Sequence, residues 1–360
     1  MHKRFWALVL ALLMVLSLAA CGAKDDDDDE EDGDDRDRVS IEDVLQRGRR
    51  ETVDPETLPE EARHLLSRFG WYGGFEKTAF DAEHIDPGSS VLDETFPHAV
   101  DFDAYPGPAA EEFAVGDPRG QFSMCSVYDA EKTDWILKHI FHYTQHDIDA
   151  LRKAADESEL SFYYEDGSYY IFAGGVGGGY EIFPCHVETD GERYCVTYAS
   201  YFGDGEFGFV GMQYAELSEE EIDGETYWTL HKWSSTVPEA EDTPSESLAQ
   251  DCAGSWVLDA DGMSEVLISD VADGHFTMQC GFYRLVGFTA DAVLQSDGKT
   301  AVFTDAEGGE FSGWAELGSD AITLHVFCCP DYEDASLFYD YFSDNNPFTY
   351  SRGGSAPEAE

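Results

Sequence analysis

The last third of the chain alternates short apolar runs with turn residues at a nearly even step, and this rhythm limits the fold more than any other feature. Turn signals recur about every 10 to 14 residues. They stand at Asp261-Gly262, Asp273-Gly274, Gly287, Asp297-Gly298, Gly308-Gly309 and Gly318. Short strands joined by tight turns build an up-and-down meander. Residues 252–345 are therefore predicted to form a small all-β barrel or sandwich.

Helical periodicity precedes the strands in the middle of the chain. The stretch "EKTDWILKHIFHYTQHDIDALRKAADES" has apolar residues at helical spacing, which predicts two helices broken near Thr144. From Leu160 the period changes to two, which predicts antiparallel hairpins. The predicted fold class is thus α+β for residues 39–233, with helices packed on a curved antiparallel sheet, followed by the small all-β unit. Residues 234–251, rich in Pro, Ser and Glu, are predicted to be a linker and 346–360 a disordered tail.

The N-terminal residues indicate where the protein is located in the cell. A basic start and a short apolar run over residues 1–20 indicate a signal peptide, because the run is too short to span a bilayer as a helix. Leu18-Ala19-Ala20-Cys21 resembles the lipobox of bacterial lipoproteins. That resemblance implies cleavage before Cys21, lipidation of its sulfur with a diacylglyceryl group, and a membrane-anchored protein on the extracytoplasmic face. The alternative is an ordinary secretory signal with a chance cysteine.

Charge indicates a spacer after Cys21 and excludes one class of partner. Residues 21–38 are mostly acidic, cannot bury apolar surface and are predicted to form a disordered tether. The whole chain has 75 Asp+Glu against 21 Lys+Arg, a net charge of −54. A surface so negative repels phosphate backbones, which excludes nucleic-acid binding.

Two weaker resemblances concern architecture. The segments "GSWVLDADG" and "AITLHVF" are similar to parts of small lipocalin-like barrels. Four further segments, "VDFDAYPG", "EKTDWILKHIF", "YYEDGSYYIFAGGVGGG" and "EIDGETYWTLHKWS", are similar to uncharacterised surface lipoproteins of Gram-positive bacteria. The second resemblance implies the membrane-anchored location and the architecture already predicted, and it implies no activity.

The cysteine positions allow either a disulfide or free thiols. A tight turn centred on Asp190 would place Cys185 opposite Cys195 in a hairpin, where a disulfide is expected for an exported protein. A turn of another length shifts the register and leaves two free buried thiols. No C-x-x-C pair occurs, which argues against a zinc site built from cysteines.

Histidines offer the one metal-ligating pattern. His139 and His142, with His146 further on, recur at helical spacing, and imidazole nitrogens at such spacing can hold a metal. The competing interpretation is a solvated polar helix face. The hydrolase motifs G-x-S-x-G and H-E-x-x-H are absent, and no cofactor is predicted.

Aromatic residues are the remaining candidates for binding. Ligand-contacting positions are predicted at Trp71, Tyr72, Tyr164, Tyr170 and Tyr201, because exposed aromatic rings stack on sugars or hold peptides. The predicted function is a non-catalytic binding or envelope-associated module, with a cell-wall or dietary glycan, a peptide or another envelope protein as partner. The alternative is a metal-dependent hydrolase whose site is built from scattered histidines and carboxylates.

Overall fold

The computed structural model describes most of the chain beyond the predicted tether. The described residues are 50–69, 79–86, 100–114, 118–120, 125–157, 162–172, 180–202, 208–238, 244–306, 311–328, 341–342 and 345–352. They belong to one compact unit, Gly48–Glu360. The signal segment, Cys21 and the tether lie outside the described residues, and so do Trp71 and Tyr72. No helix within these ranges is both long and apolar enough to cross a membrane.

The predicted α+β class, with helices packed on a curved sheet, is wrong. The described part of the chain is mostly β, with 52% strand and 20% helix. Its α-helices are α3 (Glu60–Phe69), α5 (Ala130–His139), α6 (Gln145–Glu157) and α7 (Ser247–Asp251). The sequence pattern placed the first predicted strands at Leu160, so it missed the strands that lie between α3 and α5 and gave the helices too much weight.

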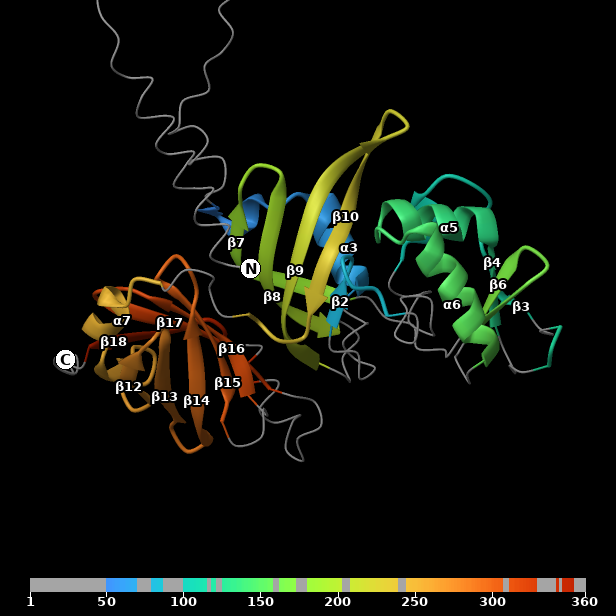
Figure 1. The fold of residues 1–360 in the computed structure, drawn as a ribbon. Coiled ribbons are helices and arrows are strands. Elements are labelled where there is room, and N and C mark those ends of the chain that lie inside the picture. The colour runs from blue at the N-terminus through green and yellow to red at the C-terminus, as the bar shows by residue number, and fades with distance from the viewer. Residues whose placement is uncertain are drawn as a thin grey trace, which may run out of the picture. The chain divides into compact units, whose positions relative to one another are not determined.

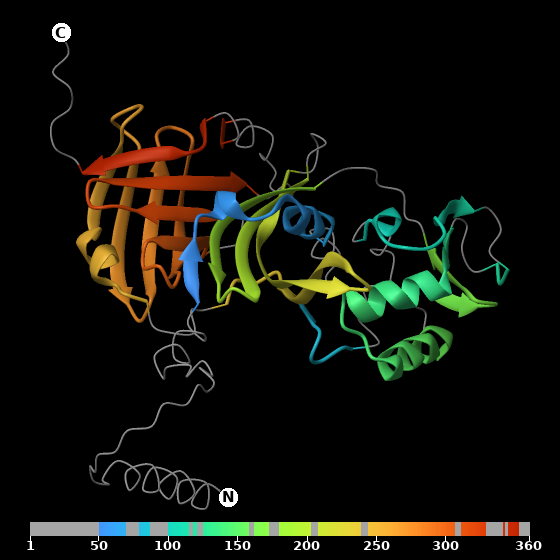
Figure 2. The same ribbon diagram turned by 90° about the horizontal axis from the view of Figure 1, so that it is seen from above.

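Two strands in that interval change the architecture. β3 (Glu111–Ala114) and β4 (Cys125–Asp129) join the hairpin of β5 (Phe162–Glu165) and β6 (Ser168–Phe172) in a separate four-stranded sheet, ordered β3-β4-β6-β5. The predicted hairpin is therefore not continuous with the strands that follow it. Helices α5 and α6 lie side by side next to this sheet (Figures 1 and 2).

A six-stranded antiparallel sheet forms the middle of the described chain, in the order β1-β7-β8-β9-β10-β2. Its strands are β1 (Glu51–Val53), β2 (Ala79–Asp81), β7 (Tyr180–Thr189), β8 (Arg193–Phe202), β9 (Gly208–Ile222) and β10 (Glu225–Ser234). The β9–β10 hairpin turns at Asp223 and Gly224, both with positive φ, as a tight two-residue turn requires. This turn sets the register that pairs Glu220 with Tyr227 and Ser218 with Thr229.

The predicted barrel is confirmed as a closed ring of eight antiparallel strands in sequence order (Figure 1). The strands are β11 (Gly254–Leu258), β12 (Glu265–Ala272), β13 (His275–Phe282), β14 (Val286–Leu294), β15 (Thr300–Asp305), β16 (Phe311–Leu317), β17 (Ala321–Cys328) and β18 (Phe348–Arg352). β18 closes the ring between β11 and β17, although its residues fall in the segment predicted to be a tail.

Two large apolar cores hold these elements. One spans α3, α5, α6 and the six-stranded and four-stranded sheets, and it includes Phe69, Phe141 and Trp233. The other fills the barrel, where Phe282, Phe288 and Phe311 are among its rings. The first core is the one that fixes the candidate site, because the residues flanking His142 are part of it.

Candidate metal centre

His142 lies in the short connection between α5 and α6, and its neighbours fix where it points. Ile140, Phe141 and Tyr143 are all buried in the core. The Tyr143 amide donates to the Leu137 carbonyl at 2.9 Å, which closes the connection into a tight loop. His142 has a φ of 57°, a left-handed conformation that a residue with a Cβ seldom adopts. Such strain persists only where the surroundings impose it, and it is common at functional sites.

His231 stands at an irregularity in β10. The pairing with β9 shifts between Leu230 and Lys232, so His231 is the extra residue of a β-bulge. The Leu230 amide donates to the Ile140 carbonyl at 2.8 Å, and the His231 carbonyl accepts from Ala82 at 2.8 Å. Bulges redirect side chains and are frequent beside active sites. Here the bulge and its two backbone hydrogen bonds hold His231 against the loop that carries His142.

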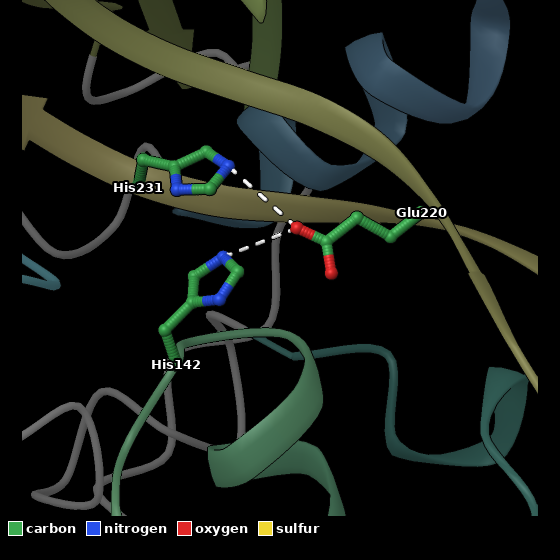
Figure 3. Close-up of side chains that lie close together, drawn as sticks. All are labelled: His142, Glu220 and His231. Atoms are coloured by element: carbon green, nitrogen blue, oxygen red, sulfur yellow. Dashed lines mark ion pairs between the residues drawn. The ribbon is translucent and has the colours of Figure 1, made fainter. Parts of the chain in front are cut away.

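Glu220 completes the group from the neighbouring strand β9 (Figure 3). Its Oε1 lies 3.9 Å from Nε2 of His142 and 3.9 Å from Nε2 of His231. One ligand atom from each of the three residues lies within 4.8 Å of the others. Figure 3 shows both imidazoles turned toward the same carboxylate oxygen, although the residues come from three different elements. The donors therefore converge on one point.

Hydroxyl groups of the same hairpin surround the group. Ser218 Oγ lies 2.6 Å from His231 Nε2 and donates to Glu220 Oε1 at 3.2 Å. Thr229 Oγ1 donates to the same Glu220 oxygen at 3.3 Å. The two hydroxyls that bind Glu220 orient this carboxylate, as outer partners of metal ligands do, whereas an ion bound at Nε2 of His231 would have to replace the contact with Ser218. Nε2 of His142, by contrast, is buried and makes no hydrogen bond.

Electrostatics keep both imidazoles uncharged at neutral pH. Burial lowers the pKa of His142, and the guanidinium of Arg193 adds to this effect while Glu220 opposes it. Burial also lowers the pKa of His231, to about 4, with further contributions from His142 and Arg193. The rings stack with centroids 4.3 Å apart. A neutral imidazole nitrogen is the form that binds a metal, so the pair is ready to coordinate at pH 7.

Two imidazoles and one carboxylate form a donor set suited to Zn²⁺ and related divalent transition metals. Tetrahedral ligands about 2.0–2.1 Å from zinc lie roughly 3.3 Å from one another, so a bound ion would draw these donors somewhat closer. Glu220, whose side chain is 40% exposed, can move to do so. Three protein ligands leave one position for water or another small ligand, as in catalytic zinc sites. A cavity of about 290 Å³ adjoins the group.

The predicted histidines separate in the structure. His142 belongs to the group, whereas His139 Nδ1 lies 2.8 Å from the Trp135 carbonyl and its ring packs on that indole. His146 is exposed on α6. Helix α5 ends at His139, so the three histidines do not share one helix face. Helical spacing therefore identified one member of the candidate group for the wrong geometric reason.

Of the two alternatives for Cys185 and Cys195, a disulfide or two free thiols, the structure shows free thiols. Cys185 and Cys195 are both free and buried. Cys195 lies opposite Glu188, and Cys185 falls at a register shift in β7, because Thr189 pairs with Tyr194 around a longer turn than the disulfide requires. Burial raises the pKa of the Cys195 thiol to about 11. Cys185 donates a hydrogen bond to the Thr197 carbonyl at 3.4 Å.

The predicted aromatic residues do not form one binding surface among the described residues. Tyr164 packs edge to face on Tyr169, and Tyr170 stacks on Tyr163 at 4.8 Å. Tyr201 lies in β8 opposite Glu181, and Trp71 and Tyr72 are outside the described ranges. Other aromatics do line a cavity of about 850 Å³ beside β7 and the barrel, namely Phe183, Trp314, Phe327 and Phe342.

Sequence reasoning missed Glu220 and His231. A signal for them was available in part, because alternation along "ELSEEEIDGETYWTLHKW" puts Ser218 with Glu220 and Thr229 with His231 on strand faces. The bulge that moves His231 toward Glu220 leaves no trace in the sequence. The approach of His142 depends on core packing between distant segments. No family model, curated protein or solved structure matches this chain.

Proposed function

We propose that the protein is a metal-binding module that holds one divalent transition-metal ion between His142, His231 and Glu220. The observation that supports this proposal is the convergence of the three ligand atoms, within 4.8 Å of one another, from three separate elements. The buried His142 Nε2 without a hydrogen bond adds to it, because such an atom is costly unless a ligand satisfies it. The proposed ion would satisfy that nitrogen.

Zinc titration of the purified full chain tests the proposal. We expect one Zn²⁺ per chain in calorimetry, in a large excess of Mg²⁺ that saturates diffuse binding to the many carboxylates. His142→Gln and His231→Gln should each weaken binding by at least about tenfold, since even outer-shell changes cost 10–100-fold. His146→Gln is the matched control and should bind as the parent does. Binding that ignores both site variants would refute the assignment.

We also propose that the module lies outside the cytoplasm and is held to the membrane through Cys21. It is supported by the match of Leu18-Ala19-Ala20-Cys21 to the lipobox and by the acidic stretch that follows. Two or more acyl chains make such an anchor stable, where one chain binds only marginally. Mass spectrometry of the native protein should find Cys21 as the N-terminal residue carrying acyl chains. An unmodified Cys21 would remove this part of the proposal.

Glycan binding is a second candidate function, supported by the aromatic cavity of about 850 Å³. Phe183 is 40% exposed there, 6.2 Å from the ring of Phe327, and Glu181 and Glu316 supply acceptors for sugar hydroxyls. A glycan array probed with the full chain tests it. Retention should fall with Phe183→Ser and persist with Tyr283→Ser, a similarly exposed aromatic outside the cavity. No retention on any glycan would exclude this candidate.

A further inference from the structure

The cavity beside the three metal ligands is lined by two cationic side chains, Arg193 and Lys232. Such a pairing is unusual for this chain, which has 21 Lys+Arg against 75 Asp+Glu. Arg193 begins β8 and Lys232 follows the bulge residue His231 on β10. Both side chains are about two-fifths exposed, at 42% and 41%, so their charged ends are open to solvent and to a ligand.

One buried carboxylate holds both cations in position. Glu216, with 8% of its side chain exposed, lies 3.7 Å from Arg193 through one oxygen and 3.7 Å from Lys232 through the other. Tyr214 donates a hydrogen bond to it at 3.0 Å. At these separations the cations are paired but not tied into short hydrogen bonds, so their N–H donors can serve a further acceptor. One carboxylate between two cations leaves one positive charge unbalanced.

The charge around the cavity becomes positive once a divalent metal is bound. A divalent ion whose only charged ligand is Glu220 keeps one net positive charge, because both imidazoles are neutral. Glu83 also lines the cavity, but it is exposed and offsets only one charge. Arg193 lines the same cavity as His142, Glu220 and His231. A metal and a guanidinium would thus face the same small space.

We propose that a small oxyanion, a carboxylate or a phosphate, occupies the open coordination position and bridges the metal to Arg193. This inference rests on the proposed metal site. The planar guanidinium has a fork of donors that matches two oxygens of a carboxylate or phosphate. The cavity of about 290 Å³ lies at the small end of the range for ligand pockets, which suits a small anion and excludes a large one.

Cobalt substitution separates this inference from the metal site itself. The purified full chain is loaded with Co²⁺, whose visible absorption reports its coordination, and is titrated with inorganic phosphate and with acetate in a non-coordinating buffer. We expect a saturable change in the Co²⁺ bands with at least one anion. Arg193→Gln should weaken that anion by about tenfold or more, the effect of removing a charged hydrogen-bond donor, while Co²⁺ affinity changes much less. Arg284→Gln, a barrel cation distant in sequence and outside the cavity lining, should match the parent.

The outcomes distinguish a failure of the oxyanion inference from a failure of the metal site. Co²⁺ binding without any response to either anion overturns the oxyanion inference and leaves the metal site standing. A response that Arg193→Gln does not weaken also overturns it. A response confined to phosphate supports it and narrows the ligand to phosphates, and a response confined to acetate narrows it to carboxylates. If Co²⁺ does not bind at all, the metal site and the inference fall together.

Discussion

At the scale of residues, the buried His186 and the partly buried His231 have pKa values shifted in opposite directions. The pKa of His231 falls to about 4, whereas that of His186 rises to about 9. Burial alone would lower the pKa of His186, but the negative charges of Asp297 and Glu188 beside its ring outweigh it. Nδ1 of His186 lies 3.5 Å from Asp297 and Nε2 lies 3.6 Å from Glu188. Neighbouring charge, not burial, therefore decides which histidine is protonated.

We expect the stabilising contribution of protonated His186 to be lost at alkaline pH. Its folded pKa of about 9 lies above its ordinary value of 6.5, so its contribution is complete below pH 6.5 and is lost as pH rises through 9. We expect the free energy of unfolding to fall by up to about 3 kcal/mol between pH 6 and pH 9.5. Denaturant titrations at both pH values measure it.

The matched variants for this prediction are His186→Gln and His146→Gln. The first should be less stable at pH 6 and should lose most of the alkaline dependence. The second, exposed on α6, should keep the parent's profile. The lowered pKa values of Asp297, about 2, and Glu188 have the opposite sign, so those carboxylates stabilise the fold above pH 4 and stop doing so in acid. An unchanged alkaline loss in His186→Gln would contradict the assignment.

At the scale of elements, close contact between strands β16 and β17 depends on one glycine. A Cβ added at Gly313 would lie 1.8 Å from the His325 carbonyl oxygen, which is backbone and cannot move aside. At Gly281 on β13 the nearest atom would be 3.7 Å away, an ordinary contact. The two positions therefore form a test and its control within one barrel.

Gly313→Ala should destabilise the barrel by about 3 kcal/mol or more, since overpacking a well-packed core costs 1–3 kcal/mol and here the clash is with backbone. Gly281→Ala should change stability by less than about 1 kcal/mol. Thermal and denaturant unfolding of the two variants measures both effects. Equal stability of the two would mean that β16 and β17 are not so closely paired.

The elements also mark how far sequence could predict the fold. The barrel was predictable because its turns depend on local chemistry: Gly262, Gly274 and Gly298 all adopt the positive φ that their Asp-Gly pairs indicate. The split into three sheets was not, because β4 pairs with β6 through contacts distant in sequence and β3 joins that sheet only through β4. Of the site, only His142 could be named, since the bulge at His231 has no sequence signature.

At the scale of the whole molecule, the barrel is closed by its last strand. β18 pairs with β11, where Trp256 lies opposite Arg352, and with β17, where Leu324 lies opposite Phe348. Phe348 and Tyr350 are buried in the barrel core, 3% and 0% exposed. Without β18 the barrel loses these two rings and leaves unpaired edges on β11 and β17.

A chain ending at Pro347 should therefore lose at least about 3 kcal/mol from the two aromatic rings alone and should associate through its open strand edges. A chain ending at Gly353 retains β18 and serves as the control. Size-exclusion chromatography and thermal unfolding distinguish them, with oligomers and a lower melting temperature expected only for the shorter chain. A monomeric short chain of unchanged stability would contradict the role of β18.

This closure also sets an order of events during biosynthesis. β11 is made early in the barrel and waits, with one edge unsatisfied, for a partner that is made last. The ring thus cannot form while the ribosome is still translating its strands, and loop closure over such a span is slow. The edge of β11 stays open until β18 has been added, so a chain cut short before Arg352 keeps an unpaired strand edge that another chain can pair with.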